Sequence, residues 1–373
     1  MARKIVFVLP NLLTGGAQRV VVNLMENLSS KKFDVKLVVL NKKKRIYKNK
    51  EIDGNYISNF LDDGRTIFLE SNGAGKSMPK LLSFIWKEKP DLIFSTISYL
   101  NMYLLSLSLF FPRKTKLVVR ETNMLSYKFP QIKQRIFLRW FFALIFKQAY
   151  HIVFQSKAMQ DDFLNLFKGF SYNSKIIFNP VQSDFIQRQS AETCDEIEAS
   201  YTNCLLVGHL TRQKAYDVLI RAIPILNDKN FRFHIIGRGP EREKLKEMAD
   251  FYGVSNQIIF HGYQKNPYKF MNKADVFVHT ARFEGLPNAV LEAGILGKPL
   301  ILSDCPGNIH GMITDSFGCV FQNENPDDLA AQLRRFKNMH FSPEAIAAAF
   351  MKNYNARKIG RDYDMFLSKI ADD

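Results

Sequence analysis

Short apolar runs rich in β-branched and aromatic residues recur along the chain, and segments with helix-like spacing of apolar residues separate them. In the first half the runs cover residues 4–9, 34–40, 91–95, 116–119, 151–155 and 175–178, and in the second half residues 204–207, 231–236, 257–260, 275–279, 299–302 and 319–322. Apolar runs that alternate with helical patterns are typical of parallel strands joined by crossover helices. The pattern therefore predicts an α/β chain with two doubly wound parallel sheets.

The length of 373 residues exceeds the size at which a single hydrophobic core keeps growing. Residues 182–202 are polar and lack a core pattern, so we place the hinge there, between an N-terminal domain (1–180) and a C-terminal domain (181–355). Two helical segments follow residue 343, and we expect the last of them, at about 356–373, to pack back on the first domain. Two facing Rossmann-like domains predict a ligand site in an interdomain cleft, at the carboxyl ends of the strands.

The net charge is confined to the N-terminal half. Residues 1–180 hold 29 Lys and Arg against 12 Asp and Glu (+17), and the remaining residues hold 52 − 29 = 23 against 36 − 12 = 24 (−1). This asymmetry indicates an anionic partner for one half of the molecule, either nucleic acid or anionic lipid.

The four cysteines show no pairing or metal-like spacing, which favours a reducing cytosol. No apolar run approaches the length of a spanning helix, so we expect a soluble or peripheral protein.

Residues 131–147 mix bulky apolar side chains with cations at both ends, as in helices that lie in a membrane interface. Nucleic-acid-binding faces rarely carry so many Phe and Leu residues, so the segment favours anionic lipid at the inner face of the membrane over nucleic acid. A core helix with basic ends is the alternative, because apolar residues cover most of the helix circumference. The cations Lys42–Arg45, with Lys48 and Lys50, are interpreted as a solvated loop that adds to the general field.

Two carboxylates eight residues apart form the main candidate site. Glu284 follows the apolar run 274–280, and Glu292 lies just over one turn inside a helix for which Pro287 is the expected first residue. Helical side chains lean toward the N-terminus, so Glu292 is directed toward Glu284 and the free backbone N–H groups of the helix start. The apolar helix should be buried, and Glu292 therefore needs a partner. Alternatively, Glu292 caps a neighbouring backbone and Glu284 is a solvated loop charge.

Two further strand-to-helix loops contain residues suited to phosphate. Gly15 and Gly16 open a helix after the first strand, where backbone N–H groups could approach a phosphate or sugar, although adjacent glycines often form only a tight turn. Residues 208–214 place His209, Arg212 and Lys214 at a helix start. Cations there oppose the helix dipole, so a diphosphate ligand explains them better than helix stability does, with plain surface charge as the alternative.

Other strand ends supply weaker candidates. The glycine-rich turn 237–243 is assigned mainly to structure, and Tyr263 could hold a nucleobase. Ser98, Glu121 and Asn123 end strands of the first domain and are candidates for the acceptor side. The histidines lack metal-ligand spacing and the only Asp-x-Asp lies in the C-terminal helical region, so no metal site is expected.

With these motifs, the chain resembles the retaining glycosyltransferases of family 4, which have the GT-B fold. The resemblance spans nearly the whole length and rests on Gly15-Gly16-Ala17-Gln18-Arg19, on Gly208 with Lys214, on Ile236 to Glu241, and on Phe283 to Pro287 with Glu292. The sequence differs from the family in having His209 where Arg is usual, Ala215 where Gly is usual, and Glu121 near a position where many members have His.

The resemblance implies transfer of a hexosyl unit from a nucleotide diphosphate sugar, expected to be UDP-linked, to a hydroxyl of a glycan or lipid-linked acceptor in surface polysaccharide assembly. It implies that Glu284, Lys214 and Arg212 take part in catalysis without a metal or cofactor. The implied donor-binding residues are Gly15, Gly16, Gly208, His209, Tyr263, Phe283, Gly285, Leu286, Pro287, Asn288 and Glu292. A nucleotide-sugar 2-epimerase of the same fold is the alternative enzyme, and a basic nucleic-acid-binding protein is the alternative of another class.

Overall fold

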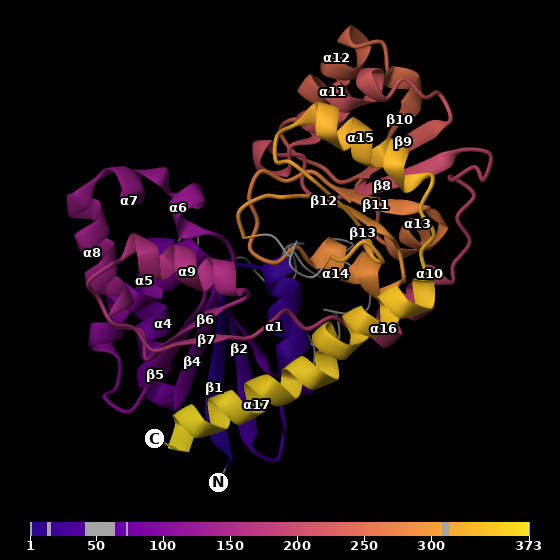
Figure 1. The fold of residues 1–373 in the computed structure, drawn as a ribbon. Coiled ribbons are helices and arrows are strands. Elements are labelled where there is room, and N and C mark those ends of the chain that lie inside the picture. The colour runs from indigo at the N-terminus through magenta and orange to yellow at the C-terminus, as the bar shows by residue number, and fades with distance from the viewer. Residues whose placement is uncertain (1, 13–15, 42–63, 72–73, 308–312, 373) are drawn as a thin grey trace. The chain divides into compact units, whose positions relative to one another are not determined.

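The computed structural model describes residues 2–12, 16–41, 64–71, 74–307 and 313–372. The chain divides into two compact units, which we call unit 1 (residues 1–180 and 356–373) and unit 2 (residues 181–355). Each unit is built on a parallel sheet with helices packed against it (Figure 1). The prediction of two doubly wound parallel sheets is confirmed.

In the described part of unit 1, parallel strands are ordered β3-β2-β1-β4-β5-β6-β7. The strands are Arg3–Leu9 (β1), Phe33–Asn41 (β2), Thr66–Ser71 (β3), Leu92–Thr96 (β4), Lys116–Arg120 (β5), His151–Phe154 (β6) and Ser174–Ile176 (β7). The helices are Gly16–Asn27 (α1), Ala74–Glu88 (α4), Ser98–Leu107 (α5), Ser108–Phe110 (η1), Leu125–Lys128 (α6), Pro130–Gln134 (α7), Ile136–Phe146 (α8), Lys157–Leu166 (α9) and Ala356–Asp372 (α17).

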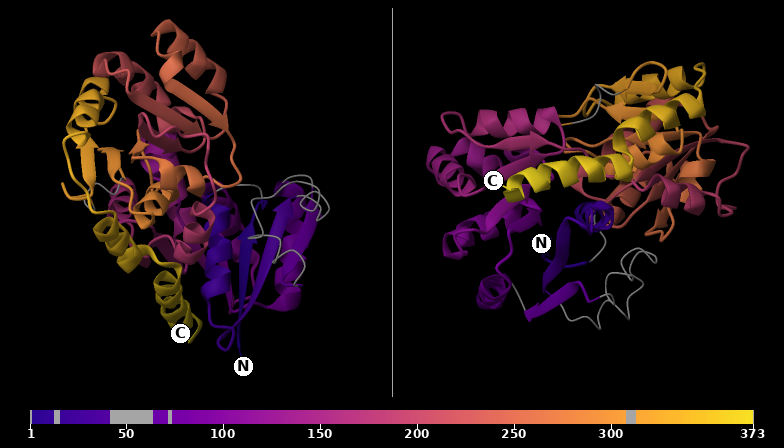
Figure 2. Two further views of the ribbon diagram at one scale, coloured as in Figure 1. Left: turned by 90° about the vertical axis from the view of Figure 1, so that its right-hand side faces the viewer. Right: turned by 90° about the horizontal axis from the view of Figure 1, so that it is seen from below.

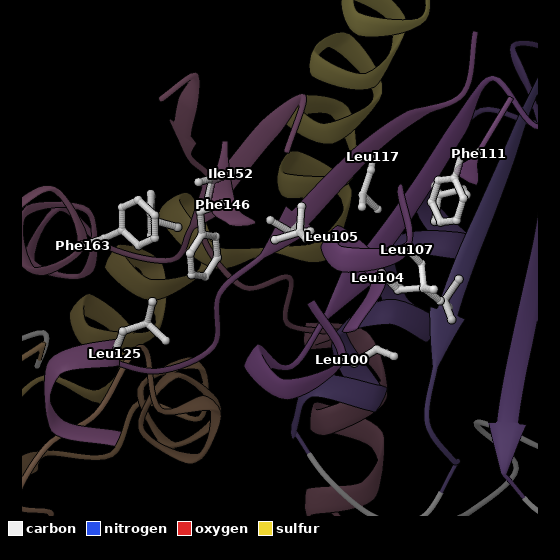
Figure 3. Packing of buried hydrophobic residues seen from close by; sticks show 14 of the residues in the cluster. Leu100, Leu104, Leu105, Leu107, Phe111, Leu117, Leu125, Phe146, Ile152 and Phe163 are labelled. Atoms are coloured by element: carbon white, nitrogen blue, oxygen red, sulfur yellow. The ribbon is translucent and has the colours of Figure 1, made fainter. Parts of the chain in front are cut away.

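Both faces of the unit 1 sheet are covered, as continuous apolar strands require. Along β1, Ile5 and Phe7 join one buried cluster with residues of α1 and α17, while Val6 and Val8 join a second cluster on the opposite face. The second cluster is formed by α5, α8 and α9 with the strands beneath them (Figure 3). The helices on the two faces hold the sheet in place, and with it the strand ends that carry the candidate residues.

The C-terminal helix α17 belongs to unit 1. It packs against α1 at an angle (Figure 1 and Figure 2), and the contact is tight: a Cβ added at Gly360 would lie 2.5 Å from the Asn27 Cβ. Lys32 forms an ion pair with Asp364 across the same contact. The chain therefore returns to its first unit after completing the second.

In unit 2 the described strands are ordered β10-β9-β8-β11-β12-β13, all parallel. They are Thr202–Val207 (β8), Phe231–Ile236 (β9), Ile258–Gly262 (β10), Val276–His279 (β11), Leu300–Ser303 (β12) and Gly318–Phe321 (β13). The helices are Ser183–Ser190 (α10), Arg212–Lys214 (η2), Tyr216–Leu226 (α11), Arg242–Phe251 (α12), Ser255–Gln257 (η3), Tyr268–Lys273 (α13), Asn288–Ile295 (α14), Pro326–Phe336 (α15) and Pro343–Tyr354 (α16).

Two expectations about helices were wrong. Residues 131–147 form two helices, α7 and α8, with an extended residue at Arg135 between them. The break buries Ile132 while leaving Ile136 exposed, although a continuous helix would put residues four apart on one face. The polar segment 182–202 contains α10, which packs on α13 and buries Ile186.

One boundary and one further strand also differ from those predicted. Pro287 is the extended N-cap of α14, and the helix begins one residue later at Asn288. Strand β3 was not predicted at all, although it pairs in parallel with β2, with a register shift between Val39 and Asn41.

Candidate functional site

The candidate residues of unit 2 lie in loops that leave the carboxyl ends of β8 and β11. These strands are neighbours in the sheet, and the strand order reverses between them. The β8 strand is followed by residues 208–215, and β11 by residues 280–287. Ligands of doubly wound sheets bind at such a reversal, because the loops on its two sides diverge and leave space.

A buried ion pair joins the two loops. The Lys214 ammonium in η2 donates to the Glu284 carboxylate, which is only 7% exposed. Burial raises the pKa of Glu284, but the Lys214 charge outweighs burial and brings that pKa down to about 2. Glu284 is therefore ionised across the physiological range, and it is not the solvated loop charge of the alternative interpretation.

His279, the last residue of β11, lies beneath this pair. Its Nε2 is 3.6 Å from the Glu284 Oε1, which is beyond hydrogen-bond range. Burial lowers the pKa of His279, so the ring is neutral at pH 7 and Lys214 supplies the positive charge next to Glu284.

The loop after β8 presents the remaining predicted phosphate ligands. Arg212 is exposed, and its guanidinium has no hydrogen-bond or ion-pair partner among the described residues. A Cβ added at Gly208 would lie 3.1 Å from the Tyr216 Oη and 3.4 Å from the Lys214 Cε, so a side chain there would crowd both groups. His209 is exposed, with its Nδ1 3.1 Å from the Arg238 carbonyl oxygen.

Arg238, in the turn after β9, connects His209 with Tyr263. The Arg238 guanidinium carbon lies 5.2 Å from the centre of the Tyr263 ring, which is 40% exposed. The flanking glycines allow the turn to approach the β8 loop, because a Cβ at Gly237 would lie 1.8 Å from the Gly208 carbonyl oxygen. This backbone contact accounts for the glycine-rich turn in structural terms, as the sequence indicated.

The segment that opens α14 is largely buried. Phe283 is half-buried, Gly285, Leu286 and Pro287 are buried, and Asn288 begins the helix. Glu292 lies in the middle of α14 among buried Val290, Leu291 and Ala293 and is 6% exposed. The prediction of a buried apolar helix with an internal carboxylate is confirmed for this segment.

The candidate residues of unit 1 centre on Glu121, which directly follows β5 and is fully buried. Its carboxylate accepts 2.7 Å hydrogen bonds from the Ser98 hydroxyl and from the Asn101 amide, both in α5. Burial raises the pKa of Glu121 despite these two donors. The structure thus brings Ser98 and Glu121 together, while Asn123 lies half-buried two residues further along.

The glycine pair is only partly described. Gly16 is the exposed first residue of α1, and Gly15 lies outside the described residues, as do Lys42–Arg45, Lys48 and Lys50. Gly16, Ser98, Glu121 and Asn123 belong to unit 1, and the other candidates belong to unit 2.

Comparison with known proteins decides the family. Residues 14–185 match the family model "Glycosyltransferase Family 4", and residues 196–353 match "Glycosyl transferases group 1". Both halves of the chain are thereby assigned to one kind of enzyme. The chain is a family 4 glycosyltransferase. Its resemblance to this family, stated from the motifs, is confirmed.

Individual relatives agree with this assignment. This glycosyltransferase is 30% identical to an uncharacterized glycosyltransferase of Methanocaldococcus jannaschii over 68% of its own length and 66% of the relative's. It is 24% identical to the N-acetylgalactosamine-N,N'-diacetylbacillosaminyl-diphospho-undecaprenol 4-alpha-N-acetylgalactosaminyltransferase of Campylobacter jejuni, over 87% of each chain. The fold matches the crystal structure of Anabaena HepE in complex with UDP and glucose, with a TM-score of 0.79, 16% identity and coverage of 98% and 99% of the two chains.

Sequence reasoning missed three residues of these sites in the glycosyltransferase. Asn101 holds Glu121, and Arg282 and Thr280 hold the turn that carries Lys214. Arg282 could have been noticed, because it is a charged residue three positions after the buried strand β11 and two before Glu284. Asn101 could have been found as the residue one helical turn after Ser98.

The residues that the structure describes contain neither a metal-like cluster of ligands nor a membrane-spanning helix. No group of three or more His, Cys, Asp or Glu residues in this part of the chain is placed to hold a metal ion. None of its helices combines the length and the apolarity needed to span a bilayer.

Proposed function

We propose that this glycosyltransferase transfers a hexosyl unit from a UDP-sugar to a hydroxyl of a lipid-linked glycan, with retention of the anomeric configuration. The observation that carries the proposal is the Lys214–Glu284 pair, a cation and an ionised carboxylate at the strand-order reversal of unit 2. A nucleotide sugar has a diphosphate that needs cations and hydroxyls that need acceptors. The HepE complex with UDP and glucose, which has the same fold, supports UDP as the nucleotide.

Lys214 and Arg212 are suited to the diphosphate. An ammonium has three donors, of which Lys214 gives one to Glu284, and its side chain keeps 21% of its surface exposed. The Arg212 guanidinium is exposed as well. The two cations would stabilise the charge that develops on the departing diphosphate. Glu284 would accept a hydrogen bond from a hydroxyl of the transferred sugar, and Glu292 from the ribose hydroxyls.

The reaction requires no protein nucleophile. The bond between the sugar C1 and the diphosphate oxygen breaks, and its electrons leave with UDP. The acceptor oxygen bonds C1 on the face that the diphosphate leaves, so the configuration is kept. The acceptor proton passes to the leaving phosphate oxygen. The protein contributes position and charge, which are the main sources of stabilisation when charge moves onto a leaving group.

We assign the acceptor side to unit 1, with Ser98, Glu121 and Asn123 as the residues to test. The Campylobacter jejuni relative supports a lipid-linked acceptor, because its name describes a substrate carried on diphospho-undecaprenol. The excess of 17 positive charges in residues 1–180 would favour an acceptor that carries a diphosphate.

The function is tested by first finding the donor and then following its products. A thermal-shift panel of UDP-glucose, UDP-galactose, UDP-N-acetylglucosamine and UDP-N-acetylgalactosamine identifies the donor that stabilises the protein most. UDP release is then measured with and without a polyprenyl-diphosphate-linked sugar. Release that depends on the acceptor supports the transferase. Conversion of the donor to its C2 epimer without any acceptor assigns the protein to the 2-epimerases instead.

We also propose peripheral attachment to an anionic membrane through α8. Five of its large apolar side chains are at least half exposed: Ile136, Phe137, Trp140, Phe141 and Leu144. Burying them in a core was the alternative, and the structure leaves them on the surface. Exposed Arg135 and Lys147 stand at the two ends of the helix, with half-buried Arg139 between them. Apolar residues beside cations suit the boundary between acyl chains and anionic headgroups.

Flotation with vesicles tests this attachment. The protein should float with phosphatidylglycerol vesicles, less with phosphatidylcholine vesicles, and less as salt rises. Replacing Arg135, Arg139 and Lys147 with Glu should abolish flotation while UDP binding persists. The matched control replaces the exposed cations Lys31, Lys89 and Lys114 with Glu, which changes the charge of unit 1 by the same amount. Equal flotation of the two triple variants would show that the general field, and not α8, attracts the protein.

A further inference from the structure

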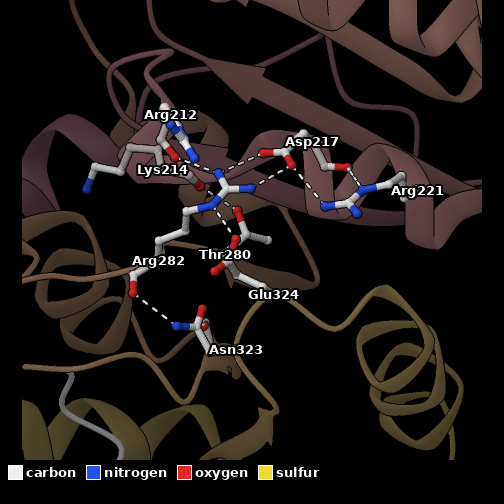
Figure 4. Close-up of polar contacts among 9 residues, drawn as sticks. Arg212, Lys214, Asp217, Arg221, Thr280, Arg282, Asn323 and Glu324 are labelled. Carbon is white, nitrogen blue, oxygen red and sulfur yellow. Dashed lines mark hydrogen bonds and ion pairs between the residues drawn. The ribbon is translucent and has the colours of Figure 1, made fainter.

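The three residues of η2 are tied to the segment after β11 by their carbonyl oxygens. The Arg212 carbonyl accepts from the Arg282 Nη1 at 2.6 Å, the Gln213 carbonyl from the Arg282 backbone N–H at 2.8 Å, and the Lys214 carbonyl from the Thr280 hydroxyl at 2.7 Å. Figure 4 shows the Arg282 side chain reaching across to this turn. All three carbonyl oxygens of η2 thus accept hydrogen bonds from Thr280 or Arg282. These bonds fix the position of the turn along its whole length.

The Arg282 guanidinium is in turn held by carboxylates. Its Nη1 and Nη2 bond the two oxygens of Asp217, at 3.0 and 2.7 Å, and its Nε bonds Glu324 at 2.5 Å (Figure 4). Asp217 also pairs with Arg221 one turn along α11. A forked pair of this kind fixes the orientation of both side chains, which a single ion pair does not.

Nearly all the N–H donors of Arg282 are used within the protein. A guanidinium has five N–H donors, and four of those of Arg282 go to Asp217, Glu324 and the Arg212 carbonyl. Two carboxylates also offset its charge. Only one N–H donor of Arg282 is left for a phosphate, whereas Arg212 in the turn is exposed.

The turn needs outside support for two reasons. A 3₁₀ turn of three residues has little stability of its own, and it ends at Ala215, whose φ of +52° lies in the left-handed region that side chains disfavour.

We propose that Arg282 is a positioning residue for the donor diphosphate, which holds the turn of Arg212 and Lys214 against the loop of Glu284 without contacting the substrate. This inference rests on the proposed function, because it presumes that the two cations bind the diphosphate. Thr280 performs the same task from the other end of the turn.

The test measures how well the intact protein distinguishes UDP from UMP, using calorimetry. The two nucleotides share the nucleoside and differ in the second phosphate, so the ratio of their Kd values reports the cation turn. The wild type should prefer UDP. Arg282→Gln should reduce this preference about tenfold while its Kd for UMP stays within about twofold. Arg221→Gln is the matched control, because Arg221 pairs with the same Asp217 but makes no contact with the turn among the described residues. It should keep the wild-type ratio.

A second variant covers the case in which Arg282→Gln fails to fold. Thr280→Val keeps the shape of a buried side chain and changes no charge, but it removes the hydrogen bond to the Lys214 carbonyl. It should reduce the UDP preference in the same direction.

The outcomes are distinguishable. A wild type that binds neither nucleotide contradicts the proposed function itself. A wild type that prefers UDP, with Thr280→Val and Arg282→Gln keeping that preference, overturns the positioning role. Loss of the preference in Arg282→Gln alone, with Thr280→Val unchanged, also overturns it, because the arginine would then act through its own charge.

Discussion

Glu284 in unit 2 and Glu121 in unit 1 occupy similar places in similar folds, and they are held in opposite ways. Each follows a strand of a parallel sheet at its carboxyl end, and each is almost fully buried. Glu284 is paired with the Lys214 ammonium, whereas Glu121 is held by the neutral donors of Ser98 and Asn101. The fold therefore supplies the position of a carboxyl group, while its surroundings lower the pKa of that group at Glu284 and raise it at Glu121.

Backbone strain accompanies both carboxyl groups. Ile97, directly before Ser98, has a φ of +84°, and Ala215, directly after Lys214, has a φ of +52°. Positive φ is uncommon for residues with side chains and is a true outlier for a β-branched one. In each unit the residue that donates to the carboxylate thus has a strained neighbour, which the surrounding hydrogen bonds hold in place.

The largest effect should come from breaking the charged pair. Glu284→Gln and Lys214→Ala should each lower kcat/KM by about 10²–10³-fold, the usual loss when one preorganised charged group is removed from the reacting centre. Steady-state assays of UDP release measure it, with melting curves to confirm folding. Lys229→Ala, an exposed lysine of the same unit, is the control. Full activity in either site variant would remove Glu284 and Lys214 from the mechanism.

The two carboxyl groups should give pH dependences of stability with opposite signs. The folded-state pKa of Glu284, about 2, lies below its ordinary value of 4.5. Its charge therefore stabilises the fold by about 3 kcal/mol above pH 4.5, and this contribution is lost as pH falls through 2. Glu284→Gln should destabilise the protein at pH 7, and the difference from the wild type should shrink on acidification.

Glu121 is expected to behave in the reverse sense. Its pKa is raised, so the neutral form suits the fold and stability falls as pH rises from 4.5 through the folded-state pKa. Glu121→Gln should therefore stabilise the protein at pH 7, and the gain should disappear below pH 4.5. Urea unfolding between pH 3 and 8 measures both variants. Destabilisation by Glu121→Gln at pH 7 would mean that Glu121 is held as an anion, like Glu284.

A third carboxylate sharpens the contrast within unit 2. Glu292→Ala should raise the Kd of UDP about tenfold and leave kcat nearly unchanged, because a hydrogen bond between a charged group and the ribose is remote from the reacting carbon. Calorimetry with UDP measures the change, and Glu292→Gln, which keeps an acceptor oxygen, should lose less. If UDP binds Glu292→Ala as tightly as it binds the wild type, the ribose contact is wrong.

The regular parts of the fold could be predicted because their signals are local. Apolar runs with turn residues between them located twelve of the described strands, while β3 was missed because polar residues flank the three apolar residues of its segment, Thr66–Ser71. The extended residue at Arg135 was missed because it depends on burying Ile132 in the second cluster of unit 1, which the local pattern does not encode.

The candidate site was predictable only as far as its motifs reach. Glu284 and Lys214 were each found within a strand-to-helix loop, but their pairing joins residues 70 positions apart. The same holds for Arg282 with Asp217 and Thr280 with Lys214, which are separated by 65 and 66 positions. Such partners come together only when β8 and β11 pair, so a single sequence shows the charges without showing which of them offset one another.

The smallest effect should come from the strained residue beside Lys214. Ala215→Gly removes a cost of about 1–2 kcal/mol for a side chain in the left-handed region. It also loses the burial of a methyl group, about 0.8 kcal/mol, and adds about 0.4–1 kcal/mol of chain entropy to the unfolded state. These contributions nearly cancel, so Tm should move by less than about 4 °C, with the KM for the donor unchanged. Ala215→Val should lower Tm much further, because a β-branched side chain tolerates this conformation least. A several-fold change in donor KM for Ala215→Gly would show that the strain at this turn contributes to binding, and that Arg282 and Thr280 do not suffice to hold it.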